Sequence, residues 1–256
     1  MKQKQKARVI SQKQIGPDIY DMWLDTGIAG QTAAGQFICI YPKDRSTLLP
    51  RPISICEVNK EGTGIRVVYR IAGQGTREFS SYGEGDEADV LGPLGNGFPI
   101  GAAEGKRALL LGGGIGIPPI LQLAKQIRGD KLIGAGYRDE NLFLKEDLEQ
   151  YARTVIATED GSRGAKGNVL DAISEDGYEA DVIFACGPMP MLRAVKEYAR
   201  KKNIPAYISL EEHMACGVGA CLGCVVKTKN VDAHSHVHNA RICTDGPVFE
   251  AGEVEI

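Results

Sequence analysis

The hydrophobic pattern of the chain changes near Lys106, and this change constrains the fold more than any other feature. Before it, short apolar or alternating runs such as QFICIYP, ISICEV and GIRVVYRI are separated by turns that contain Gly and Pro. Such spacing is typical of a small antiparallel barrel or sandwich. One short helix is expected in this region, with Thr76 as its N-cap and residues 77–82 as its body.

Beyond Lys106 the sequence alternates between strand and helix patterns. The run RALLLG is continuously apolar, as a parallel strand buried on both faces requires. The following PPILQLAKQI places its apolar residues on one helical face. Further strand patterns are KLIGAGY, TVIAT, DVIFAC and AYISL, and the helices between them are expected to begin near Leu144, Asn168 and Met189. This alternation predicts a parallel sheet with helices on both faces.

The tail beyond Ser209 is irregular and rich in Gly and Cys. It is too short to bury an independent apolar core, so a bound metal group is expected to hold it together. We therefore predict a mixed β and α/β fold in three domains. These are an N-terminal antiparallel β-barrel over residues 1–100, a parallel α/β nucleotide-binding domain over 101–208 and a small C-terminal metal domain over 209–256.

Charge and apolar run length argue against two classes of partner. The net charge of −3 is unlike that of a nucleic-acid-binding protein. The longest apolar run, ALLLGGGIGIPPI, is broken by Gly and Pro and too short to cross a bilayer. No apolar stretch follows the basic start, so no signal peptide is expected and the chain is interpreted as cytoplasmic. Thiols stay reduced in that compartment, so the seven cysteines favour metal or redox chemistry over disulfides.

Three cysteines in the tail, Cys216, Cys221 and Cys224, follow the spacing C-x4-C-x2-C, and Cys243 lies further on. This is the plant-type spacing for a [2Fe–2S] cluster, in which a distant fourth thiolate completes the ligand set. The intervening glycines tolerate positive φ and let backbone N–H groups approach the sulfurs. A structural zinc site with four thiolates is the alternative, although zinc motifs usually pair two close C-x2-C elements.

Two motifs in the barrel region suggest a phosphate-bearing ligand. In RPIS, residues 51–54, the Arg51 guanidinium can pair with a diphosphate, and Ser54 offers a hydroxyl to a ring nitrogen or carbonyl. Gly75 and Thr76 of YRIAGQGT lead into a helix whose N-terminus presents free N–H groups to an anion. Alternatively, RPIS is a turn into a strand and GQGT a hairpin or cap.

Three loops after strands of the nucleotide-binding region are candidate ligand loops, because ligands in such sheets bind at strand C-terminal ends. GGGIGIPP follows a buried strand and opens a helix, as a phosphate-binding loop does. However, Ile117 replaces the third glycine of the dinucleotide-binding fingerprint, so the segment fits a tight strand-to-helix connection without a ligand equally well. Cys186 of CGP lines a pocket or fills the core. Glu159 and Asp160 follow another strand and could accept a hydrogen bond from a ribose hydroxyl, which would favour NAD over NADP. The alternative is that both are solvated loop carboxylates. Arg138 could instead pair with the 2′-phosphate of NADP, so NADP stays an alternative.

The barrel motifs resemble the flavin-binding signature of the ferredoxin reductase superfamily, and GGGIGIPP and CGP resemble its nicotinamide-nucleotide loops. In that resemblance Arg51 contacts the FAD diphosphate, Ser54 approaches flavin N5, and Ile53 stands where many members carry a stacking Tyr. The implied FAD residues are Arg51, Pro52, Ile53, Ser54, Tyr69, Arg70, Ile71, Gly75 and Thr76. The implied NAD residues are Gly112, Gly113, Gly114, Gly116, Asp160, Cys186, Gly187 and Pro188.

The order of the motifs, ending in SLEEHMACGVGACLGC and CTDGPVF, resembles the electron-transfer subunits of NAD-dependent (class 1B) dihydroorotate dehydrogenase over essentially the whole chain. The resemblance implies an FMN-bearing catalytic partner subunit, assembled with this chain as a heterotetramer of two of each. It also implies electron flow from FMN through the [2Fe–2S] cluster and FAD to NAD⁺ in pyrimidine biosynthesis. Dihydroorotate oxidation is then the partner's reaction, and no catalytic residue is assigned in this chain.

Two other functions remain open from the residues. One is an NAD(P)H-dependent flavin and iron–sulfur reductase serving another redox partner, and the other is a non-enzymatic zinc-stabilised binding module. His213 stands where many members of the family carry Arg. His234, His236 and His238 are spaced so that a strand would direct all three to one face, but surface histidines in a loop are the commoner case.

Overall fold

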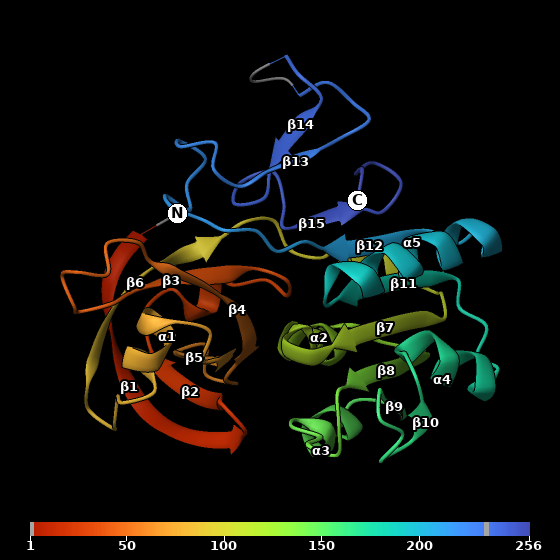
Figure 1. Ribbon diagram of the computed structural model, residues 1–256, viewed down its shortest axis with the longest axis horizontal. Helices are drawn as coiled ribbons and strands as arrows, with labels where there is room; N and C mark the ends of the chain where they lie inside the picture. The colour runs from red at the N-terminus through yellow and green to blue at the C-terminus, as the bar shows by residue number, and fades with distance from the viewer. Residues whose placement is uncertain (1–2, 233–235) are drawn as a thin grey trace.

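The computed structural model describes residues 3–232 and 236–256. A barrel forms the N-terminal part, an α/β sheet the central part, and the tail lies across one end of both (Figure 1). This architecture confirms the predicted fold class. The boundaries at residues 100 and 208 stay predictions. In the described part of the chain, no helix is long and apolar enough to cross a membrane.

The barrel is closed by six antiparallel strands in the order β1-β2-β5-β4-β3-β6, and β1 pairs with β6 to complete it. Closure leaves no free strand edge. Its strands are β1 (Gln3–Gly16), β2 (Ile19–Asp25), β3 (Phe37–Tyr41), β4 (Arg51–Val58), β5 (Gly64–Arg70) and β6 (Glu87–Leu94), with a 3-10 turn at Ala29–Gln31. The first strand pairs with β6 from Gln3 onward, and along it the exposed side chains of Lys4, Lys6 and Arg8 pair with Asp89, Glu87 and Asp25.

The short helix after β5, α1, spans Gln74–Phe79, so the prediction that Thr76 is its N-cap was wrong. Thr76 lies within the first turn instead. Its hydroxyl accepts from the backbone N–H groups of Ala72 and Gly73 at 2.9 and 3.2 Å and donates to the Gly73 carbonyl. A threonine in the first turn can bond back to the chain before the helix. The sequence pattern alone does not distinguish this position from the N-cap.

The central sheet has the order β10-β9-β8-β7-β11-β12-β15, and every neighbouring pair is parallel except β12 with β15. The chain runs outward from β7 in one direction and then returns to continue with β11 on the other side. The C-terminal ends of β7 and β11 therefore define a topological switch point, where such sheets bind ligands. The strands are β7 (Ala108–Gly113), β8 (Lys131–Tyr137), β9 (Thr154–Thr158), β10 (Ala165–Lys166), β11 (Val182–Cys186), β12 (Ala206–Ser209) and β15 (Val248–Glu250).

Helices cover both faces of this sheet, as predicted. Alternate residues of one strand point to opposite faces, so Leu110 of β7 packs with α2 while Leu109 packs with α4 and α5. Figure 1 shows α2 between the barrel and the sheet. The helices are α2 (Ile117–Gln126), α3 (Lys145–Glu149), α4 (Val169–Asp176) and α5 (Met189–Lys202), with 3-10 turns at Ile100–Ala103 and Gly114–Gly116.

The tail contains a two-stranded antiparallel hairpin, β13 (Val225–Lys227) and β14 (Asn239–Arg241), and then contributes β15 to the edge of the large sheet. Its buried side chains include Cys224, Ile242 and Phe249, which pack in the same core as Ile208 of β12 and Leu94 of β6. Apolar contacts with the barrel and the sheet therefore hold the tail, in addition to any metal group.

Candidate redox cofactor sites

The four tail cysteines lie in the loop before β13 and in the turn after β14, and they form two pairs. Cys216 lies next to Cys221, and Cys243 lies next to Cys224. The second pair is buried, whereas Cys221 is exposed and Cys216 is partly buried. One side of the site thus faces solvent, and the other is packed against the protein core.

Backbone N–H groups point at the sulfurs of Cys216 and Cys221. The Val218 N–H donates to Cys216 Sγ and the Gly223 N–H to Cys221 Sγ, each at 3.4 Å. Burial raises the pKa of the Cys216 thiol, but N–H donors from Val218 and Cys221 outweigh it and lower the pKa to about 6. The loop therefore favours a thiolate, the form that binds metal.

The pairing of the thiols fits a di-iron cluster. A [2Fe–2S] cluster takes two protein ligands at each of its two irons. The pairs Cys216–Cys221 and Cys224–Cys243 have that arrangement.

Gly217 closes the loop against the barrel. Its φ is +67°, and a Cβ there would lie 3.0 Å from Cys39 Sγ on β3. We expect Gly217→Ala to weaken retention of the metal centre roughly tenfold, since an L-residue in this conformation costs about 1–2 kcal/mol. Iron per chain after gel filtration in a chelator measures it. Gly223→Ala is the matched control, because its Cβ would meet Cys221 Sγ at an ordinary 3.5 Å; equal iron loss in both variants would contradict the assignment.

A first cavity, of about 540 Å³, lies between β4, β5, the start of α1 and the beginning of the tail. Of the residues assigned to FAD, seven line it: Arg51, Pro52, Ile53, Ser54, Tyr69, Arg70 and Thr76. Gly75 lies beneath Arg51, since a Cβ at Gly75 would be 2.8 Å from Arg51 Nε. Ile71 is not part of the lining. The two motifs, separated in sequence, thus meet around one cavity.

The charge of Arg51 is available to a ligand in this cavity. Its Nη1 donates to the Leu49 carbonyl at 2.6 Å, and it has no carboxylate partner in the described part of the chain. A half-buried guanidinium without a counter-ion suits a bound phosphate. The donor set of the cavity therefore fits a flavin dinucleotide.

Sequence reasoning missed the wall of this cavity that the tail supplies. Residues 209–214 and Pro247 line it, together with Phe37, Val68, Ala72 and Ile115. His213 and Met214 belong to this wall, and Met214 is only two residues from Cys216. The available signal was this closeness in sequence to the cysteines, because a loop that begins at the end of β12 must start at the ligand-binding edge of the sheet.

A second cavity, of about 680 Å³, lies at the C-terminal ends of β7, β8 and β9. Gly113, Gly114 and Pro188 line it among the residues assigned to NAD. Gly112, Gly116, Cys186 and Gly187 lie behind that surface. They support it: a Cβ at Gly116 would lie 2.5 Å from the Cys186 carbonyl, so the two loops touch.

Glu159 lines the second cavity, whereas Asp160, the next residue, is not part of its lining. The Asp160 carboxylate accepts hydrogen bonds from the hydroxyl and the N–H of Ser162, at 2.6 and 2.9 Å, and these lower its pKa. Both bonds are accepted by Oδ1, so this oxygen is engaged within its own turn. Arg138 and Asp139 lie beside Glu159 in the lining.

Arg70 lines both cavities, so the two are adjacent at the end of β5. The Arg70 guanidinium lies near the glycine loop, about 4.0 Å from where a Cβ of Gly114 would be. The histidines of the tail lie elsewhere. His238 Nδ1 is 2.9 Å from the Lys229 carbonyl, His236 lies in the loop before β14, and His234 is outside the described residues.

A closed flavin-type barrel, a parallel nucleotide sheet and paired thiolates define an electron-transfer protein of the ferredoxin reductase type, with FAD, NAD and a [2Fe–2S] cluster as cofactors. Residues 211–255 match the family model of the iron–sulfur cluster binding domain of dihydroorotate dehydrogenase B. The dihydroorotate dehydrogenase B (NAD⁺) electron transfer subunit of Streptococcus mutans is 43% identical over 257 residues, covering 98% of each chain. That of Lysinibacillus sphaericus is 41% identical over 262 residues, covering 100% of each.

The chain belongs to the family of electron transfer subunits of NAD-dependent dihydroorotate dehydrogenase B. The fold agrees with this family. An NADH-dependent reduced ferredoxin-NADP oxidoreductase superimposes with a TM-score of 0.84 at 27% identity, covering 97% of this chain and 89% of that one.

Proposed function

We propose that this chain receives electrons from an FMN-bearing catalytic subunit at the Cys216–Cys221 side of its tail and delivers them to NAD⁺ at the second cavity. The arrangement of the three sites carries the proposal. The cysteine loop adjoins the first cavity through Met214, and the first cavity adjoins the second through Arg70. The partner is expected to assemble with this chain as two copies of each.

A flavin between the other two cofactors meets a chemical requirement. When bound, the cluster exchanges single electrons, FAD exchanges either single electrons or a hydride, and NAD accepts only a hydride. The chain between Met214 and Cys216 spans at most about 7 Å. A cluster on these cysteines is therefore held close to the flavin cavity.

The residues of the first cavity have separate roles in this proposal. Arg51 and the N-terminus of α1 bind the diphosphate of FAD, and Ser54 orients the isoalloxazine ring. The tail wall covers the side of the cavity that faces the cysteine loop, so the flavin is shielded from water on the side where electrons arrive.

Glu159 is the residue we propose for the ribose hydroxyls of NAD, in place of Asp160. We expect Glu159→Gln to weaken NADH binding about tenfold, because a hydrogen bond to a charged acceptor contributes roughly 1.5 kcal/mol or more. Asp160→Asn is the control, with an expected change of less than about twofold. Titration of each variant with NADH, followed by flavin absorbance, measures its NADH affinity. A larger loss of affinity in the Asp160 variant would show that Asp160, and not Glu159, binds the ribose.

The function is tested by mixing this chain, loaded with FAD and cluster, with the FMN-bearing subunit of the same complex. Dihydroorotate is expected to reduce NAD⁺ only when both subunits are present, and orotate is expected to form in equal amount. NADH reduction of an artificial dye without any dihydroorotate-dependent NADH formation would instead indicate a reductase serving another partner. Light scattering of the purified complex tests the expected two copies of each chain.

A further inference from the structure

One face of β5 forms the contact between the barrel and the nucleotide-binding sheet. Residues two apart on a strand share a face, so Arg66, Val68 and Arg70 point the same way. Val68 packs into the core that contains α2 and the strands of the sheet. Arg70 lines both cofactor cavities. The third residue of this face, Arg66, is 6% exposed.

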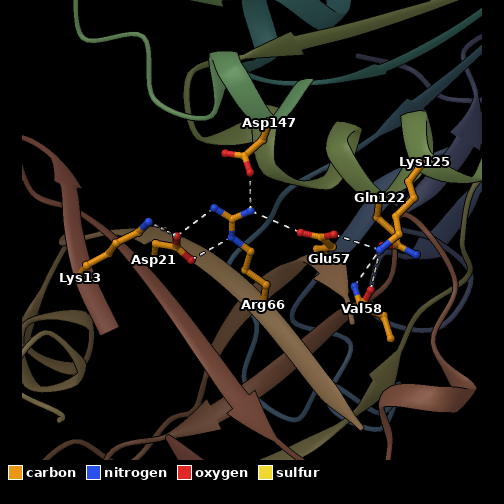
Figure 2. Close-up of polar contacts among 8 residues, drawn as sticks. All are labelled: Lys13, Asp21, Glu57, Val58, Arg66, Gln122, Lys125 and Asp147. Carbon is orange, nitrogen blue, oxygen red and sulfur yellow. Dashed lines mark hydrogen bonds and ion pairs between the residues drawn. The ribbon is translucent and has the colours of Figure 1, made fainter. Parts of the chain in front are cut away.

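Arg66 is bound on three sides by carboxylates from different elements (Figure 2). Its Nε and Nη2 donate to the two oxygens of Asp21 on β2, at 3.0 and 2.9 Å. Its Nη1 donates to Glu57 on β4 at 3.3 Å and to Asp147 on α3 at 3.0 Å. Two of these partners belong to the barrel, and the third belongs to a helix of the nucleotide-binding region.

A second cation extends the network to α2. Lys125 Nζ lies 2.9 Å from Glu57 Oε1 and 2.8 Å from the Val58 carbonyl. The Val58 N–H donates to Gln122 Oε1 at 3.0 Å. With Lys13 3.7 Å from Asp21, three cations face three carboxylates, and the charges balance. We refer to these side chains, Lys13, Asp21, Glu57, Arg66, Gln122, Lys125 and Asp147, as the Arg66 network.

Arg66 and Asp21 are the buried centre of the network, with side-chain exposures of 7% and 2%, and removal of one partner of such a pair leaves the other charge unpaired at a large cost. The Arg66 guanidinium donates in fixed directions to carboxylates of β2, β4 and α3, so these three elements must keep one relative arrangement for the bonds to form. The Arg66 network lies at the contact between the two cofactor-binding parts, on the strand whose end carries Arg70. Its geometry therefore constrains how the two cavities face each other.

We propose that Arg66 is a positioning residue, which holds the barrel against α2 and α3 and so sets the approach of the nicotinamide to the flavin. The inference rests on the proposed assignment of the two cavities. Hydride transfer requires close and aligned reactants, and a displacement of about 1 Å can cost a hundredfold in rate. Transfer between the cysteine loop and the flavin depends on the packing of the tail with β3 and β6, where Phe37, Cys39 and Leu94 lie, and not on the Arg66 network.

The test is Asp147→Ala in the complex loaded with its cofactors. This variant removes the link to α3 but leaves Arg66 paired with Asp21 and Glu57, and alanine is a good helix former. Reduction of bound FAD by NADH in a single turnover is expected to slow about tenfold. Reduction of FAD by dihydroorotate without NAD is expected to stay within about twofold, with FAD content unchanged. Asp147→Glu is expected to restore most of the NADH-driven rate.

Hydrogen exchange supplies a readout that does not depend on turnover. Amide protons of residues 64–70 and of α3 are expected to exchange about tenfold faster in Asp147→Ala. Glu149→Ala is the matched control, because the exposed Glu149 lies on the same helix and, within the described residues, forms an ion pair only with Lys145, at 2.8 Å. If Asp147→Ala and Glu149→Ala show the same NADH-driven rate and the same exchange, the proposal is wrong. If dihydroorotate fails to reduce FAD in the unmodified complex, the proposed function fails instead.

Discussion

Replacement of Cys221 by alanine is expected to abolish dihydroorotate-driven reduction of NAD⁺, while NADH still reduces an artificial dye through FAD. The variant leaves one iron with a single protein thiolate, and a di-iron cluster requires four. The first cavity is lined by residues of the barrel, of residues 209–214 and of Pro247, and Cys221 is not among them. The visible spectrum should lose the iron–sulfur component and keep the flavin bands.

Cys56→Ala is the matched control for this experiment. Cys56 is a fully buried thiol of β4 that packs in the core between the barrel and the sheet. Removal of its sulfur is expected to lower the free energy of unfolding by about 1 kcal/mol and to leave the cluster in place. A Cys221 variant that keeps its iron and its dihydroorotate-driven activity would remove the cysteine loop from the electron path.

Replacement of Arg51 by alanine is expected to weaken FAD binding about a hundredfold. Two charge-assisted hydrogen bonds to a diphosphate contribute about 3 kcal/mol together, and tenfold in affinity corresponds to about 1.4 kcal/mol. The loss should be large because the cavity of residues 51–54 and 69–76 offers Arg70 as its other guanidinium, at the far end near Gly114. Flavin retained after dialysis, measured by absorbance, gives the affinity.

Arg77→Ala controls for loss of positive charge near the same helix, because Arg77 lies on α1 with its side chain exposed and is not part of the cavity lining. Its FAD affinity is expected to change by less than about threefold. Equal flavin loss in the two variants would show a general electrostatic effect and would contradict a direct contact of Arg51 with the diphosphate.

Local patterns were enough to predict the elements whose burial is decided by their own sequence. The continuous run of β7, the helical face of α2 and the spacing of Cys216, Cys221 and Cys224 each contain their signal within a short window. The helices near Leu144, Asn168 and Met189 begin where expected, at Lys145, Val169 and Met189. Asn168 caps α4 by accepting from the Leu170 N–H at 2.9 Å.

Features that depend on distant pairing could not be predicted in this way. The strand β15 is three residues long, and its place beside β12 is fixed by the tail's return to the sheet. The difference between Glu159 and Asp160 depends on which carboxylate the turn at Ser162 engages. Arg66 looks like an ordinary strand residue in sequence, because its three carboxylate partners lie between 9 and 81 positions away.

The central claim is that four thiolates of the tail hold a di-iron cluster next to a flavin bound in the N-terminal half. Its most direct test is the quantification of iron, acid-labile sulfide and flavin in protein purified without oxygen. We expect about two irons and two sulfides per chain for a [2Fe–2S] cluster, together with one FAD. One zinc per chain, or protein that contains neither labile sulfide nor flavin, would contradict the account.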